Sequence, residues 1–90
     1  MSKVRQIKDE YIYRAIAEFF RNPEEAVGHA RNKFIKWGFY LIPIKYVIYK
    51  AAQLQGIDLK YDEFFTDDAI YRLRKLKDIE IIETKTPERP

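Results

Sequence analysis

The side chains that most often carry enzyme chemistry are scarce in this sequence. His29 is the only histidine, Ser2 is the only serine, and there is no cysteine. A nucleophile, a base and a group that orients the base cannot be assembled from so few candidates. The absence of cysteine also excludes disulfides and thiolate metal ligands and favours a reducing compartment. We therefore expect a protein that is not an enzyme and uses no cofactor and no small-molecule substrate.

Carboxylates are concentrated in one short segment, where a metal site has to be considered. Five of them fall within eleven residues, namely Asp58, Asp62, Glu63, Asp67 and Asp68. Oxygen ligands suit Mg²⁺ or Ca²⁺, but the spacing lacks the central glycine and alternating ligands of an EF-hand. Negative charge at Asp67 and Asp68 is also what the start of a helix favours. We predict no metal site, and expect the other three carboxylates to be solvated or paired with nearby cations.

Positive charge falls into two blocks separated by this acidic segment. Between Ala26 and Ile57 the chain has no Asp or Glu, and the bases there are Arg31, Lys33, Lys36, Lys45 and Lys50. The second block has four cations in six positions: Arg72, Arg74, Lys75 and Lys77. The net charge of +3 therefore hides two basic surfaces. Such surfaces are typical of proteins that bind nucleic acid.

Hydrophobic periodicity predicts the elements that position these charges. Helices are expected over residues 9–21, 23–37 and 44–55, each with an apolar stripe at helical spacing. Asn22 and Pro23 mark the start of the second helix, and Gly38 and Gly56 stop the second and third. Residues 39–42 are ambiguous between a buried strand and an extended crossing. The shared core is predicted to contain Ile16, Phe19, Val27, Phe34, Trp37, Val47, Ala51, Leu54, Leu73 and Leu76.

The last quarter of the chain is expected to form a basic helix followed directly by a strand. Thr66 is a suitable N-cap for a helix over residues 67–78, and the β-branched run 79–84 favours a strand. Ile79 and Ile81 would face the core, which leaves Ile82 on the other face. Because the remaining tail is too short for a hairpin, we expect this strand to pair with residues 39–42 or with a second chain.

Length and composition bound the remaining possibilities. Ninety residues make one domain, expected over 9–84 between a polar tail (1–8) and a C-terminal tail (85–90). The longest uncharged run, residues 37–44, is too short to cross a bilayer, so we expect a soluble, cytoplasmic protein with no membrane partner. Abundant Lys, Glu and Ile with few Gln, Asn, Met and Cys resemble heat-adapted proteins. Aromatic residues are expected mainly in the core, with Tyr46 and Tyr49 more exposed.

Residues 44–84 resemble the three-helix core of winged helix-turn-helix regulators. In this interpretation 44–55 is the scaffold helix, 60–65 a short second helix and 67–78 the recognition helix. The stretch from Ala69 to Lys77 resembles the family's recognition helix, and residues 79–83 would form the first wing strand. The resemblance implies that the basic helix enters the major groove while the wing contacts phosphates. The fold class expected is a mostly helical, compact bundle with a small β element and a winged-helix-like C-terminal half.

These observations favour a non-enzymatic protein that binds double-stranded DNA, with a role in transcriptional regulation. The alternative is a protein-interaction module or small structural protein with no nucleic-acid role, in which the exposed Tyr residues form the binding surface. Palindromic DNA sites would call for a homodimer. The predicted DNA contacts lie on the basic helix, with a second patch in the first basic block: Tyr71, Arg72, Arg74, Lys75, Lys77, Arg31, Lys33 and Lys36.

Overall fold

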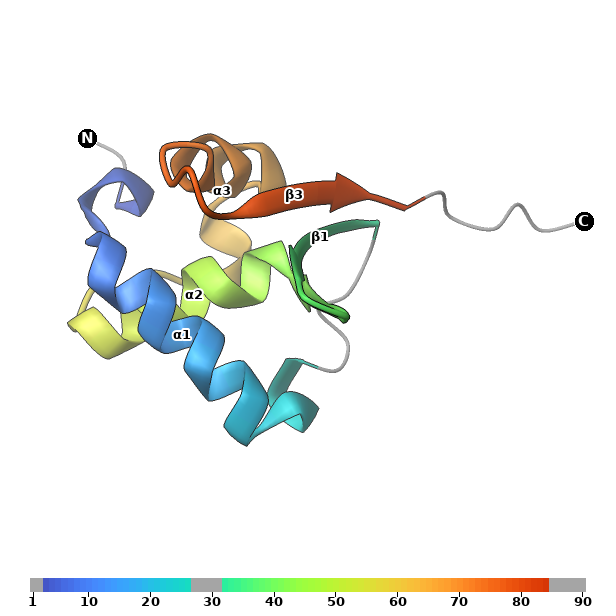
Figure 1. The fold of residues 1–90 in the computed structure, drawn as a ribbon. Helices are drawn as coiled ribbons and strands as arrows, with labels where there is room; N and C mark the ends of the chain where they lie inside the picture. The colour runs from blue at the N-terminus through green and yellow to red at the C-terminus, as the bar shows by residue number, and fades with distance from the viewer. Residues whose placement is uncertain (1–2, 27–31, 85–90) are drawn as a thin grey trace, which may run out of the picture.

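The computed structural model of the chain describes residues 3–26 and 32–84. Within these ranges, three helices and three strands form one small domain (Figure 1). In chain order they are α1 (Asp9–Arg21), β1 (Lys33–Trp37), β2 (Tyr40–Pro43), α2 (Ile44–Gln55), α3 (Thr66–Leu73) and β3 (Glu80–Glu83). Short 3-10 turns precede α1 (η1, Val4–Gln6), follow it (η2, Pro23–Ala26) and precede α3 (η3, Tyr61–Glu63). The expected combination of a mostly helical domain and a small β element is confirmed.

Helices α1 and α2 lie side by side and supply the centre of the core (Figure 1). Both begin and end where the sequence predicted. Ile12 and Ile16 of α1 and Val47 and Ala51 of α2 are buried at the helical spacing that makes one apolar stripe. Gly56 ends α2 with a φ of 85°, a left-handed conformation that glycine adopts without a Cβ clash. No helix in the described ranges is both long and apolar enough to span a membrane.

The N-terminal segment is part of the domain, so the prediction of a polar tail over residues 1–8 is wrong for its described part. Val4 and Ile7 are buried in the same core as α1 and α2. Val4 is the first residue of the single turn η1 and Ile7 follows its last residue, so the turn brings both side chains inward. Isolated apolar residues among polar neighbours gave too weak a pattern to reveal this burial.

The predicted helix over residues 23–37 is wrong beyond its first turn. Pro23 starts only the short η2 turn, and residues 33–37 form strand β1 instead. Gly38, expected to stop a helix, is the first residue of a two-residue turn that joins β1 to β2. Its φ of 61°, with no positive φ at the other turn residue, is the pattern of a type II′ hairpin turn. The ambiguous segment therefore forms strand β2 of an antiparallel hairpin.

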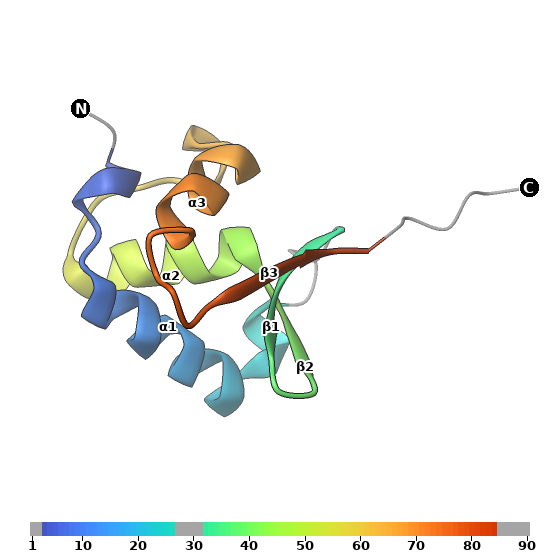
Figure 2. The same ribbon diagram turned by 45° about the horizontal axis from the view of Figure 1, so that its top comes forward.

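Strand β3 completes a three-stranded antiparallel sheet in the order β2-β1-β3 (Figure 2). The strand was predicted, but its partner within the chain is β1 rather than residues 39–42. Ile79 is buried and Ile81 packs against the core, as expected from the alternation. Ile82 lies on the opposite face, next to Phe34 of β1.

The core differs from the predicted set mainly where the second helix was wrong. Phe34 lies on the outer face of the sheet, while its neighbour Ile35 is fully buried against the helices. Leu54 is exposed, and Phe39, expected to fill the core, stands fully in solvent at the hairpin turn. Tyr46, expected to be exposed, is buried, and burial raises its pKa to about 12. Val27 lies outside the described residues.

Candidate nucleic-acid interface

Helix α3 begins with a side-chain cap that fixes its orientation. The Asp68 carboxylate accepts the backbone N–H of Phe65 at 3.0 Å, so Phe65 is the N-cap and Thr66 the first helical residue. This corrects the expected cap by one position. Asp67 stays exposed at the same end and forms a 3.5 Å ion pair with Lys33 of β1. The N-terminal end of α3 is therefore acidic and tied to the sheet.

The opposite end of α3 carries the cations. The helix ends at Leu73 rather than at residue 78, and the chain turns back toward β3. Leu73 and Leu76 are buried, and the Leu76 N–H donates to the Leu73 carbonyl at 2.9 Å, which anchors this turn on the core. Three exposed cations lie in the turn between α3 and β3: Arg74, Lys75 and Lys77. Within the described ranges no carboxylate forms an ion pair with any of them.

Tyr71 has two cations close to its ring. Its ring is 55% exposed, with the Arg5 guanidinium 5.2 Å and the Lys75 ammonium 5.3 Å from the ring centre. Cations at these distances are attracted to the electron-rich face of the ring. Arg5 was not predicted, because it lies 66 positions before Tyr71 and nothing in its local pattern links it to α3. We call Arg5, Tyr71, Arg74, Lys75 and Lys77 the basic face.

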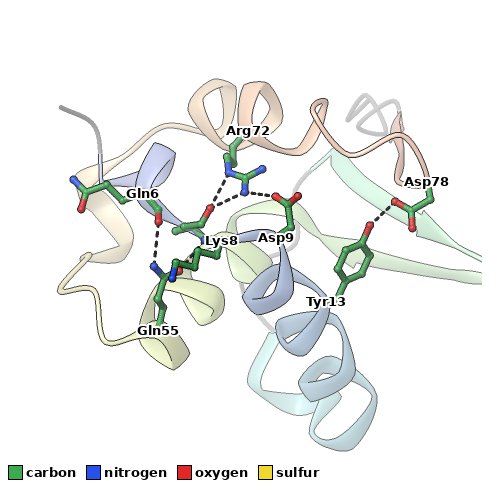
Figure 3. Close-up of polar contacts among 8 residues, drawn as sticks. Gln6, Lys8, Asp9, Tyr13, Gln55, Arg72 and Asp78 are labelled. Carbon is green, nitrogen blue, oxygen red and sulfur yellow. Dashed lines mark hydrogen bonds and ion pairs between the residues drawn. The ribbon is translucent and has the colours of Figure 1, made fainter.

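Arg72 does not belong to this face, and the prediction that it points outward is wrong. Its side chain is only 6% exposed. The guanidinium donates to the backbone carbonyl of Ile7 from Nε at 3.1 Å and from a terminal nitrogen at 2.6 Å, and it also pairs with Asp9 (Figure 3). Arg72 therefore joins α3 to the segment that enters α1. The buried guanidinium is tolerated because Nε and one terminal nitrogen are hydrogen-bonded and its charge is paired with Asp9.

Three further hydrogen bonds seen in Figure 3 connect the same elements. Gln55 at the end of α2 donates to the carbonyl of Gln6 at 3.1 Å and accepts the backbone N–H of Lys8 at 2.8 Å. The phenol of Tyr13 donates to the Asp78 carboxylate, just before β3. That hydrogen bond is the main reason why the pKa of Tyr13 is raised to about 12. These hydrogen bonds fix η1 and the segment after α3, which carry the cations of the basic face, to helices α1 and α2.

The second predicted patch does not form a single surface. Lys33 faces α3, where it pairs with Asp67, whereas Lys36 is exposed on the other face of the sheet, opposite Leu41 and Glu80. Residues three apart share a side of a helix but point to opposite faces of a strand. The separation therefore follows directly from residues 33–37 being a strand. Arg31, the third member, lies outside the described residues, as does His29.

Glu63 of the acidic segment accepts two hydrogen bonds. Glu63 accepts the N–H of Lys60 at 2.9 Å and an ammonium hydrogen bond from Lys3 at 3.1 Å. These two hydrogen bonds hold the pKa of Glu63 below its usual range, with the backbone donor contributing most. In the part of the chain that the structure describes, no three His, Cys, Asp or Glu side chains are grouped so as to hold a metal ion.

A second exposed surface is the turn of the β1–β2 hairpin. Phe39 is fully exposed there, and Tyr40 and Leu41 beside it are 56% and 42% exposed. Phe20, at the end of α1, packs edge-on against Tyr40 with ring centres 4.9 Å apart. We call Phe20, Phe39, Tyr40 and Leu41 the aromatic tip. It lies near the C-terminal end of α1 and away from α3, so it is separate from the basic face (Figure 2).

Comparison with known proteins adds no further assignment. No family model, curated protein or solved structure matches the chain.

Proposed function

We propose that this protein is a non-enzymatic DNA-binding protein, a small transcriptional regulator that contacts duplex DNA through the basic face. The observation that carries the proposal is the set of exposed cations Arg74, Lys75 and Lys77, none of which is neutralised by a carboxylate in the described ranges. Cations held in this way on a fixed turn can neutralise phosphates and release the counterions of DNA.

The arrangement of charge along α3 determines how the helix would approach DNA. Asp67 and Asp68 give its N-terminal end negative charge, which repels phosphates. Contact through the C-terminal end and the following turn reduces this repulsion, because it places Arg74, Lys75 and Lys77 nearest the phosphates. Tyr71, with Arg5 and Lys75 close to its ring, then takes part in the contact, where its hydroxyl can donate a hydrogen bond to a phosphate oxygen.

The winged-helix interpretation is kept as part of this proposal, with two modifications. The short turn η3 and helix α3 are separated by only two residues, and β3 follows α3 into the sheet, in the order expected of a helix-turn-helix followed by a wing strand. The recognition helix is shorter than expected, with eight residues. The strand beside β3 comes from β1, ahead of α2, and the hairpin of the described chain is therefore β1–β2.

The proposal is tested by titrating mixed-sequence duplex DNA at low salt with the parent protein and with a variant in which Arg5, Lys75 and Lys77 are all Ala. Arg74 is left intact because it also lines a pocket beside β3. The matched control removes three exposed cations of α1 and the hairpin: Arg14, Arg21 and Lys36. Binding by the parent and control, with a large loss for the first variant, supports the proposal. Equal binding by all three contradicts it.

A protein-interaction module is the second candidate, and the aromatic tip is the observation that favours it. Phe39 buries no surface in this structure, although exposing a large aromatic side chain is unfavourable unless another molecule covers it. Aromatic residues of this kind are enriched at the centres of protein interfaces. If the parent protein fails to bind duplex DNA at low salt, this second candidate replaces the first.

A further inference from the structure

Strand β3 is an edge strand whose free backbone groups can be identified. It lies at the end of the order β2-β1-β3, so only one of its sides is paired in the described chain. The Thr84 N–H donates to the Asn32 carbonyl at 2.7 Å. In an antiparallel pair, residues alternate between those that exchange hydrogen bonds with the neighbour and those that point away. Ile82 and Glu80 therefore bond to β1, whereas the N–H and C=O of Ile81 and Glu83 point outward from the sheet.

The outer face of the sheet carries an apolar row that stops at this edge. Pro43, Phe34 and Ile82 are aligned across the three strands by the pairing register. Phe34 and Ile82 are both partly exposed, and Ile82 is the last member of the row. An incoming strand that placed an apolar side chain beside Ile82 would continue the row and remove this surface from water.

We propose that β3 pairs antiparallel with β3 of a second copy of this chain, with Ile82 opposite Ile82 at the two-fold axis. The outward groups of Ile81 then exchange hydrogen bonds with those of Glu83 in the other copy, and the reciprocal pair does the same. Four backbone hydrogen bonds join the two sheets into one of six strands. The apolar row becomes continuous through the axis, from Phe34 and Ile82 of one copy to Ile82 and Phe34 of the other.

The hydrogen-bonding geometry and the charges together select this register. Pairing Ile81 with Ile82 of the second copy would place Glu80 opposite Glu83, but it would also oppose an outward-pointing residue to one that bonds to β1, which an antiparallel ladder does not allow. Centring the axis on Glu83 would bring two carboxylates together. Centring it on Ile81 is allowed but sets Ile82 opposite Glu80. Only the axis at Ile82 buries Ile82 against an apolar partner and keeps the glutamates apart.

Charge complementarity on the inner face favours the same occupant. Lys33, Ile70, Arg74, Ile81 and Glu83 are among the residues that line a pocket of about 170 Å³ between α3 and the sheet. In the proposed register Glu83 of the second copy lies opposite Ile81, which lines this pocket together with Arg74. The surface offered by one short strand is less than the roughly 800 Å² per partner of a stable interface, so we expect association that is lost on dilution.

Cysteine cross-linking tests the register directly, because the natural chain has no cysteine. Facing residues that do not exchange hydrogen bonds have Cα atoms about 4.5 Å apart, within the range that a disulfide spans. Ile82→Cys should therefore oxidise to a covalent dimer at least about tenfold faster than Phe39→Cys, which is more exposed but lies at the aromatic tip. Equal rates would overturn the proposal, and faster cross-linking of Ile81→Cys would overturn the register.

A second experiment uses the chain without introduced cysteines and measures its self-association by sedimentation over a dilution series. Glu83→Pro removes one outward N–H without touching the hydrogen bonds between β3 and β1. It should weaken association at least about tenfold relative to the matched Glu83→Ala, which removes the same carboxylate but keeps the backbone N–H. A parent chain that stays monomeric at every concentration would refute the dimer. Neither experiment contains DNA, so failure here leaves the proposed DNA binding standing.

Discussion

Replacing Arg72 by Met is the most informative perturbation of the fold, because Arg72 looked like a DNA contact in the sequence and is buried in the structure. Met keeps much of the aliphatic volume and removes the charge and the donors. The two hydrogen bonds to the Ile7 carbonyl, at 3.1 and 2.6 Å, are charge-assisted, and such bonding contributes about 1.5–3 kcal/mol. The pair with Asp9 adds only about 0.2–1 kcal/mol, because the Asp9 side chain is 60% exposed and screened by water.

We therefore expect Arg72→Met to lower the free energy of unfolding by about 2–4 kcal/mol, a large fraction of the stability of a small domain. Urea unfolding followed by circular dichroism measures this as a lower midpoint with an unchanged slope. Arg74→Met is the matched control, since Arg74 is exposed two positions away, and it should change stability by less than about 0.5 kcal/mol. A loss below about 0.5 kcal/mol for Arg72→Met, together with a large loss of DNA affinity, would refute the structural role assigned to Arg72.

Two further predictions concern the sheet and the contact between α1 and the β3 segment. Ile35→Ala should lower the free energy of unfolding by about 2–4 kcal/mol because Ile35 is fully buried, whereas Phe34→Ala, on the outer face, should lower it by less. Urea unfolding of both variants measures the two losses. A larger loss of stability for Phe34→Ala would contradict the register. The pKa of Tyr13 should be about 12 instead of its ordinary 10, because its phenol donates a hydrogen bond to Asp78. The hydrogen bond should therefore stabilise the fold fully below about pH 10, and its contribution should be lost as the pH rises toward 12. NMR of the tyrosine ring carbons, with Asp78→Asn as the comparison, measures it; an unshifted Tyr13 would show that the hydrogen bond is absent.

Local signals were sufficient to predict α1 and α2. Both have an apolar stripe at helical spacing, and α2 also has Pro43 before it and Gly56 after it. These features act within a few residues of each other, so the sequence displays them directly. The strand at residues 80–83 was predictable for the same reason, from its β-branched residues.

The segment 33–37 could not be assigned from local pattern alone. Phe34 and Trp37 are spaced as on a helix, and Pro23 gives a convincing start signal that the structure uses only for one 3-10 turn. What decides the strand is pairing with β2 on one side and with β3, nearly fifty residues later, on the other. Contacts at that separation leave no trace in a short window of sequence.

Part of the candidate site could be predicted from the local sequence. The exposed cations at 74, 75 and 77 follow from the alternation of charged and buried residues around Leu73 and Leu76. The burial of Arg72 depends on the Ile7 carbonyl, 65 positions away, and the position of Arg5 beside Tyr71 depends on how η1 packs on α3. Distant backbone partners of this kind are visible only once the fold is known.

The salt dependence of duplex DNA binding tests the central claim most directly, because each neutralised phosphate contributes about 0.9 to the slope of log K against log salt. If Arg5, Lys75 and Lys77 each contact a phosphate, replacing all three by Ala should make the slope shallower by about 2.7, while the control lacking Arg14, Arg21 and Lys36 should keep the parent slope. Urea unfolding of both variants establishes that each is folded at the temperature of the titration. Identical slopes for the parent and the first variant, or no duplex binding by the parent at low salt, would contradict DNA binding through the basic face.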